Sequence, residues 1–178
     1  MPKIVIIGAT TWGTTLSIAL GNAGYNVNLL TRSKTEASKI ENKRENQKLL
    51  PGFKLPSNVT INHLPKDCLD DADMLVFAVP SRRIRENAKN IVKHVNDSTI
   101  ITSASKGLES NSGKRISQVI DEEFKSIGLK NPVCALSGPN LALEIASGNP
   151  ALSVLALSLI HISEPTRLGM ISYAVFCL

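Results

Sequence analysis

Short apolar runs alternate with longer amphipathic stretches along this chain. Residues 3–7 read Lys-Ile-Val-Ile-Ile, a continuous β-branched run that is typical of a strand buried on both faces of a parallel sheet. The apolar spacing then becomes helical, and Gly24 follows where a helix commonly ends. The helical face predicted for burial comprises Trp12, Leu16, Ala19, Leu20 and Ala23.

The same order of strand and helix continues through the chain. Further strands are predicted at 26–30, 74–79, 99–102, 133–136 and 151–155, with helices at 34–46, 81–95, 112–124 and 140–146. Residues 47–60 hold Pro51, Gly52 and Pro56 and are predicted to form a loop. The alternation predicts an α/β fold, a doubly wound and mostly parallel sheet with right-handed crossovers. Ligands of such sheets bind outside the carboxyl ends of the strands, and the candidate residues lie at those ends.

The turn after the first strand reads Gly8-Ala9-Thr10-Thr11-Trp12-Gly13. A glycine-containing turn between a strand and a helix is the context of a dinucleotide-binding fingerprint. Gly8 would allow the tight turn, Gly13 would let the helix pack closely, and the helix N-terminus would offer N–H groups to a pyrophosphate. Thr10 stands where the fingerprint has its second glycine, so its side chain must point away or the cofactor must shift. An ordinary strand-to-helix turn is the alternative.

The end of the second predicted strand bears on the choice of cofactor. The segment Leu30-Thr31-Arg32-Ser33 has no acidic residue to bind the ribose hydroxyls of NAD. Arg32 could instead pair with a 2′-phosphate, because a guanidinium suits bidentate phosphate contacts. The segment therefore favours NADPH, or acceptance of both NADPH and NADH. A solvated surface arginine is the alternative.

Two later loops offer groups that suit a phosphorylated substrate. Lys106 lies beside Gly107 after a predicted strand, where its ammonium could hold a phosphate or polarise a carbonyl. An exposed turn lysine is the alternative. Ser137-Gly138-Pro139-Asn140 offers N–H groups and an amide at the start of a helix, and a helix capped in the ordinary way is the alternative.

Together these loops resemble the N-terminal domain of bacterial NAD(P)-dependent glycerol-3-phosphate dehydrogenase. The resemblance covers roughly residues 1–156. The matching motifs are Gly8-Ala9, Thr11-Trp12-Gly13-Thr14, Leu50-Pro51-Gly52, Val79-Pro80-Ser81, Ser105-Lys106-Gly107-Leu108-Glu109 and Ser137-Gly138-Pro139. Three positions depart from the family pattern: Thr10 replaces the middle glycine, Leu143 replaces a common lysine, and Leu141 replaces an aromatic residue.

The resemblance implies a Rossmann-like NAD(P)-binding domain and a set of site residues. The cofactor site would include Gly8, Thr10, Thr11, Trp12, Gly13, Arg32, Pro80, Lys106 and Ala142. The substrate site would include Lys106, Gly138 and Asn140. Lys106 would touch both cofactor and substrate and is the catalytic candidate within this chain.

The implied reaction is hydride transfer from NADPH or NADH to dihydroxyacetone phosphate, which gives sn-glycerol 3-phosphate, a glycerophospholipid precursor. The family also uses a C-terminal helical domain, whose lysine acts as general acid/base and whose arginine contacts the substrate phosphate. Without that domain, the chain is expected to be inactive alone. A homodimer is compatible with the full-length family member.

Composition and charge reduce the number of functions that the chain could have. The 178 residues are 43% hydrophobic and 20% charged, with 20 Lys+Arg against 15 Asp+Glu and a net charge of +5. The basic residues are scattered, which favours a basic pocket for a phosphorylated small molecule over a nucleic-acid surface. The three cysteines and three histidines lack the spacing of a metal site. No signal peptide or membrane-spanning run is recognised, so a cytoplasmic protein is expected.

Residues 157–178 are not expected to belong to the natural protein. They resemble the conceptual translation of a sequencing-library adapter, with a variable index at Leu168-Gly169-Met170. The predicted organisation is therefore an NAD(P)-binding domain over 1–156 and a non-native tail over 157–178. A genuine apolar tail is the alternative.

Two other functions remain open from the sequence. One is another two-domain dehydrogenase with a similar first half, such as a ketopantoate reductase. The other is a stand-alone NAD(P)-binding sensor without catalysis, which would share the turn at Gly8–Gly13 and need no second domain.

Overall fold

The computed structural model describes residues 1–157 and 172–177, and it contains one sheet with strand order β3-β2-β1-β4-β5-β6-β7-β8. The strands from β3 to β6 in this order are parallel, whereas β7 is antiparallel to β6 and β8 is antiparallel to β7. The predicted doubly wound, mostly parallel sheet is confirmed. The strands are β1 (Lys3–Ile7), β2 (Asn26–Leu30), β3 (Val59–Asn62), β4 (Met74–Phe77), β5 (Ile100–Ser103), β6 (Val133–Ser137), β7 (Leu152–Leu157) and β8 (Ser172–Cys177).

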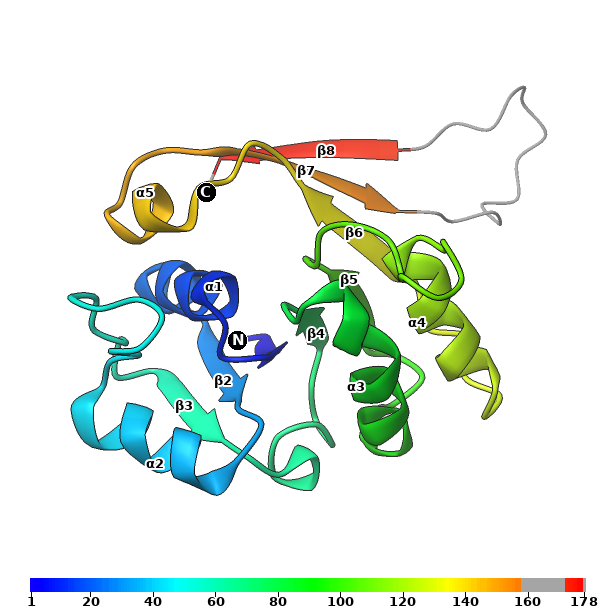
Figure 1. Ribbon diagram of the computed structural model, residues 1–178, viewed down its shortest axis with the longest axis horizontal. Helices are drawn as coiled ribbons and strands as arrows, with labels where there is room; N and C mark the ends of the chain where they lie inside the picture. Colours follow the sequence, from blue (N-terminus) through cyan, green and yellow to red (C-terminus); the bar gives the residue numbers. More distant parts are fainter. Residues whose placement is uncertain (158–171, 178) are drawn as a thin grey trace.

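Helices cover both faces of the sheet (Figure 1). They are α1 (Thr11–Asn22), α2 (Lys34–Lys43), α3 (Ile84–Ile91), α4 (Ile116–Lys125) and α5 (Ala142–Ala146), with 3₁₀ turns at Pro65–Asp67, Ser81–Arg83 and Val92–His94. Alternate residues of β1 enter two separate hydrophobic cores. Ile4 and Ile6 pack on the side of α1 and α2, and Val5 and Ile7 pack on the side of α3 and α4. Burial on both faces explains why β1 is continuously apolar.

The buried face of α1 differs in part from the predicted face. Leu16 is buried as expected, but Ala23 is exposed, and the small residues Ser17 and Gly21 face the sheet instead. The Ser17 hydroxyl donates to the Gly13 carbonyl oxygen at 2.8 Å, which satisfies its polar atom inside the core. Apolar spacing alone underestimates the burial of small and hydroxyl-bearing residues where a helix lies close to a sheet.

Several predicted boundaries are wrong. The strand predicted at 74–79 ends at Phe77, and the helix predicted at 81–95 is α-helical only over Ile84–Ile91, with a 3₁₀ turn on each side. The helix predicted at 34–46 ends at Lys43, because Arg44 takes a left-handed backbone conformation with φ 48°. Residues 47–60 were expected to be a loop, but β3 begins at Val59 and pairs with β2 at the sheet edge. The helix predicted at 112–124 begins only at Ile116, because residues 108–115 form a turn closed by a bridge between Leu108 and Arg115.

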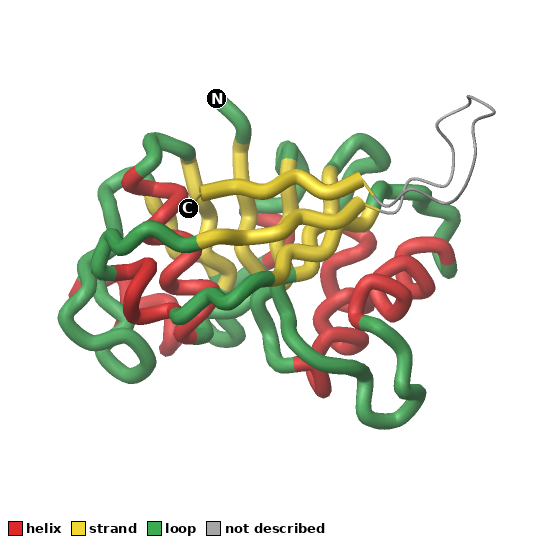
Figure 2. Tube along the Cα trace, turned by 90° about the horizontal axis from the view of Figure 1, so that it is seen from above, coloured by secondary structure: helices red, strands yellow, loops and turns green. Residues whose placement is uncertain are grey.

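The outer edge of β7 is paired with β8, and Figure 2 shows the two strands side by side. A chain ended after Leu157 would leave the backbone N–H and C=O groups of that edge unpaired, and such edges promote association. We expect the shortened chain to self-associate or precipitate at concentrations where the 178-residue chain stays monomeric. Light scattering after size-exclusion chromatography measures this. A monomeric shortened chain with an unchanged melting temperature would contradict the expectation.

No described helix is both long and apolar enough to cross a membrane.

Candidate functional site

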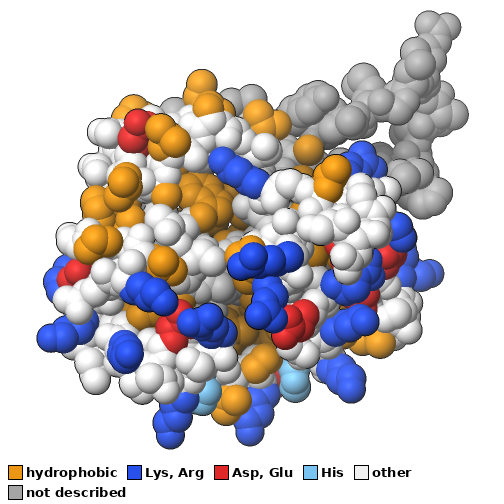
Figure 3. All heavy atoms as spheres, in the orientation of Figure 1, with side chains coloured by type: hydrophobic (Ala, Val, Ile, Leu, Met, Phe, Trp, Pro, Cys, Tyr) orange, Lys and Arg blue, Asp and Glu red, His pale blue; other side chains and the backbone are white. Residues whose placement is uncertain are grey.

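A cavity of about 360 Å³ lies at the carboxyl ends of β1, β4 and β5. Its lining comprises Thr10, Thr11, Trp12, Ala78, Val79, Pro80, Ala104, Ser105, Lys106, Asn140 and Ala142. Most predicted site residues therefore come together, although they are separated by up to 132 positions in sequence. Gly8, Gly13, Arg32 and Gly138 do not line the cavity. In Figure 3, Lys and Arg side chains surround the central hollow of this face, and hydrophobic side chains lie at its floor.

Gly8 and Gly13 shape the turn that enters the cavity. Gly8 has φ +105°, and a Cβ there would lie 2.6 Å from Val79 Cγ1. A Cβ on Gly13 would lie only 2.0 Å from the Gly8 carbonyl oxygen. Both contacts are far inside van der Waals distance, so the close approach of α1 to the end of β1 requires glycine at both positions.

Thr10 stands in place of the fingerprint's second glycine, and its hydroxyl is bonded to the surrounding backbone. Its hydroxyl donates to the Ala78 carbonyl oxygen at 2.7 Å and accepts from the Gly13 N–H at 3.0 Å, as the N-cap of α1. The side chain thus joins the turn to the end of β4. Among the described residues, the N–H groups of Thr11 and Trp12 have no hydrogen-bond partner, so they remain as donors at the helix N-terminus.

Asn46 holds the turn from the other side and was not predicted as a site residue. It is 4% exposed, and its Nδ2 donates to the Ala9 carbonyl oxygen and to Thr14 Oγ1, each at 2.9 Å. The Thr11 hydroxyl donates to the Leu49 carbonyl oxygen at 3.2 Å. The segment after α2 therefore fixes the glycine-containing turn through two buried hydrogen bonds of Asn46 and one exposed bond from Thr11.

Lys106 lies on the loop that follows β5. The preceding residue, Ser105, donates to the Val79 carbonyl oxygen at 2.6 Å, which joins this loop to the end of β4. Lys106 is exposed, and no carboxylate of the described residues lies within 4.0 Å of its ammonium. Its charge is therefore free to attract an anionic ligand in the cavity.

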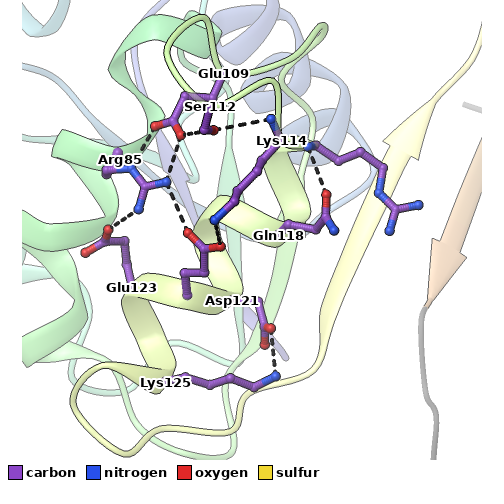
Figure 4. Close-up of polar contacts among 10 residues, drawn as sticks. Arg85, Glu109, Ser112, Lys114, Gln118, Asp121, Glu123 and Lys125 are labelled. Atoms are coloured by element: carbon purple, nitrogen blue, oxygen red, sulfur yellow. Dashed lines mark hydrogen bonds and ion pairs between the residues drawn. The ribbon is translucent and has the colours of Figure 1, made fainter.

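Arg85 on α3 anchors the far end of the same loop (Figure 4). Its guanidinium donates to both carboxylate oxygens of Glu109, each at 2.7 Å, and also to Glu123 at 2.5 Å and Glu122 at 3.1 Å. The Ser112 hydroxyl donates to Glu109 at 2.5 Å. The bidentate pair connects the Lys106 loop to α3, and the contacts with Glu122 and Glu123 extend the cluster to α4.

Arg85 and then Ser112, as hydrogen-bond donors, lower the pKa of Glu109 from 4.5 to about 2. A carboxyl whose pKa is lower in the folded state stabilises the fold above its unfolded pKa and loses that contribution as the pH falls. The pair with Arg85 should therefore be fully present above about pH 4.5 and disappear toward pH 2.

Glu109→Gln is expected to lower the free energy of unfolding at neutral pH by roughly 1–2 kcal/mol, because an ionic hydrogen-bond pair is lost. It should also remove part of the decline in stability between about pH 4.5 and pH 2. Urea unfolding at a series of pH values measures both effects, with the exposed Asp97→Asn as control. A Glu109→Gln profile that parallels the original protein would contradict this assignment.

Asn140 and Ala142 line the opposite wall of the cavity, and Gly138 shapes the loop beside that wall. Gly138 has φ +149°, and a Cβ there would lie 2.7 Å from the Leu152 carbonyl oxygen. Asn140 is 7% exposed and lines the cavity. The Thr15 hydroxyl donates to the Ala142 carbonyl oxygen at 3.2 Å, which docks α5 on α1 and places Ala142 at the cavity.

The family model for the N-terminus of NAD-dependent glycerol-3-phosphate dehydrogenase matches residues 3–162. The chain belongs to this family. It is 41% identical over 157 residues to a glycerol-3-phosphate dehydrogenase [NAD(P)+] of Dehalococcoides mccartyi, covering 88% of this chain and 44% of that protein. A relative of the same name from Desulfitobacterium hafniense is 40% identical, with coverage of 88% and 43%.

The fold of this chain also resembles solved structures. It superposes on the crystal structure of glycerol-3-phosphate dehydrogenase from Coxiella burnetii with a TM-score of 0.82 at 26% identity, covering 89% of this chain and 47% of that one. The chain thus spans less than half the length of these relatives. The family predicted from the loop motifs is confirmed, and a ketopantoate reductase assignment is set aside.

The residues of this chain fit NAD, the dinucleotide in the family's description. Gly8 and Gly13 leave no room for a Cβ, and among the described residues the N–H groups of Thr11 and Trp12 at the start of α1 have no partner. Arg32 lies apart from the cavity. Its side chain is 80% exposed, with its Nε 3.7 Å from Glu36.

The sequence interpretation missed three residues that support the site. They are the buried polar residues Asn46 and Ser153, and Arg85, which anchors the Lys106 loop. The one usable signal was a polar residue close to the Leu50-Pro51-Gly52 motif, which suggests Asn46. Within the described residues, no group of three His, Cys, Asp or Glu side chains is arranged to hold a metal ion.

Proposed function

We propose that this chain is the cofactor-binding half of an oxidoreductase that reduces dihydroxyacetone phosphate to sn-glycerol 3-phosphate with NADPH or NADH. The observation that carries the proposal is the cavity at the carboxyl ends of β1, β4 and β5. There, N–H donors of α1 and the ammonium of Lys106, which have no partner in the part of the chain that the structure describes, face one space. This donor set suits a ligand with several phosphate groups.

In this proposal, each wall of the cavity has a distinct task. Gly8, Thr10, Thr11 and Gly13 form the turn that receives the pyrophosphate, because it combines close backbone approach with N–H donors. Trp12, Pro80 and Ala142 would pack against the cofactor. The cofactor supplies the hydride, and the protein supplies orientation and charge.

The substrate would lie between Lys106 and the cavity wall at Asn140, with Gly138 next to that wall in the loop. Lys106 would attract the phosphorylated substrate and stabilise negative charge on its oxygen atoms, as an ammonium does in a site shielded from water. The family resemblance assigns the general acid/base to a lysine in the part of the relatives that this chain does not match. We therefore expect this chain to bind both ligands without turning them over.

Calorimetric titration of the 178-residue chain tests the proposal. We expect saturable binding of NADPH or NADH, and binding of dihydroxyacetone phosphate to the cofactor complex. Binding of a dinucleotide without any binding of the substrate would favour the non-catalytic sensor. Turnover by this chain alone at an ordinary enzymatic rate would contradict the assignment of the missing acid/base.

Arg32→Gln tests the proposed contact with a 2′-phosphate. Because Arg32 is exposed, we expect a loss of only about 2- to 5-fold in NADPH affinity, with NADH affinity unchanged. Lys125→Gln, which removes an exposed cation from α4, is the control. Equal affinity of the original chain and Arg32→Gln for NADPH would identify Arg32 as a solvated surface residue.

We also propose that the family domain ends near Ala156 and that residues 157–178 are not native. The resemblance of this segment to a translated adapter supports the proposal, whereas the family model matches through residue 162. Residues 158–171 and 178 lie outside the described part of the chain. Resequencing the source DNA across codon 156 distinguishes a continued reading frame from a genuine tail.

A further inference from the structure

Ser153 on β7 is fully buried, and its hydroxyl has one partner among the described residues. It donates to Asn140 Oδ1 at 3.1 Å. The contact exists because Gly138 lacks a side chain. A Cβ on Gly138 would lie 2.7 Å from the Leu152 carbonyl oxygen and 3.2 Å from Ser153 Cα, so β7 could not approach the loop.

The hydrogen bond determines which end of the Asn140 amide faces the cavity. If the amide were rotated by half a turn, Nδ2 would donate to the Ser153 hydroxyl oxygen, and the buried O–H would then have no acceptor among the described residues. A buried donor without an acceptor is unfavourable, which disfavours the rotated state. With Oδ1 held by Ser153, Nδ2 has no acceptor among the described residues. It lies 3.2 Å from the position of a Gly138 Cβ, and Asn140 is one of the residues that line the cavity.

We propose that Ser153 is a positioning residue that turns the Asn140 NH₂ group toward the cavity. The site then selects a ligand that presents an acceptor oxygen, such as a phosphate or carbonyl oxygen, at this wall. The amide orientation follows from the structure alone. The identity of the ligand rests on the proposed function, in which dihydroxyacetone phosphate supplies that oxygen.

The first test measures binding of dihydroxyacetone phosphate to the 178-residue chain saturated with NADPH. Ser153→Ala should weaken this binding by about 3- to 10-fold, the usual range for one hydrogen bond, with NADPH affinity unchanged. Ser153→Thr keeps the hydroxyl and should restore it. Ser147→Ala, which removes an exposed hydroxyl beyond α5, is the matched control. Equal losses in Ser153→Ala and Ser153→Thr, or no loss in Ser153→Ala, would overturn the proposal.

The second test reads the amide directly and needs no ligand. Nuclear Overhauser effects should connect the Asn140 NH₂ protons to the Gly138 α-protons in the original chain and in Ser153→Thr, and should weaken in Ser153→Ala. Contacts of the NH₂ protons that are stronger to the Ser153 side chain than to Gly138 in the original chain would overturn the proposal. If no variant binds dihydroxyacetone phosphate while all bind NADPH, the proposed substrate is wrong, and this spectrum alone decides the amide orientation.

Discussion

Gly13→Ala is expected to abolish measurable dinucleotide binding and to lower the free energy of unfolding by about 3 kcal/mol, at the upper end of overpacking effects. The new Cβ would lie 2.0 Å from the Gly8 carbonyl oxygen and 3.3 Å from Ala78 Cβ. The first of these contacts is with backbone, so the turn itself must move to relieve it. NADPH titration and urea unfolding of the same variant separate the two effects.

Gly24→Ala is the matched control for Gly13→Ala. Gly24 has φ +90°, but a Cβ added there would have no heavy atom within 4 Å, so only backbone strain of roughly 1 kcal/mol is expected. This variant should bind NADPH normally. If Gly13→Ala bound NADPH with unchanged affinity, the close approach of α1 to β1 would not be required for cofactor binding.

Asn46→Ala is expected to cost about 2–3 kcal/mol of stability, because it leaves the buried Ala9 carbonyl oxygen without its side-chain donor. It also removes the donor to Thr14. Since both partners lie in or beside the glycine-containing turn, NADPH affinity should fall by about 10-fold, the equivalent of 1.4 kcal/mol. Urea unfolding and NADPH titration measure the two losses.

Asn42→Ala on the exposed surface of α2 is the control for Asn46→Ala, and it should change neither quantity appreciably. An Asn46→Ala chain that is destabilised yet binds NADPH normally would show that Asn46 supports the fold but does not position the turn.

The sequence predicted the parts of the fold that depend on local pattern. The uninterrupted β-branched run at Lys3–Ile7 indicated a strand buried on both faces, and two cores indeed meet there. The turn at Gly8–Gly13 was recognised because strand, glycine and helix follow one another. By contrast, β3 has only four residues at the sheet edge, beside a proline-containing loop, so its signal was too short to separate from that loop.

The residues that position the site were harder to predict, because their partners are distant in sequence. Asn46 bonds to Ala9 across 37 positions, and Arg85 bonds to Glu123 across 38. The local pattern marks neither the partners of these residues nor their role, apart from the place of Asn46 near the Leu50-Pro51-Gly52 motif. Thr10 illustrates the same point: the sequence showed a missing glycine, but only the structure shows its hydroxyl joining Ala78 to α1.

The most direct test of cofactor binding uses the single tryptophan of the chain, which lines the cavity. NADPH and NADH should each be titrated into the folded 178-residue chain while Trp12 emission and energy transfer to the reduced nicotinamide are recorded. Saturable quenching of Trp12 with sensitised nicotinamide emission, absent in Gly13→Ala, is the predicted result. A folded chain that shows no saturable change with either dinucleotide would contradict the proposal that this cavity binds the cofactor.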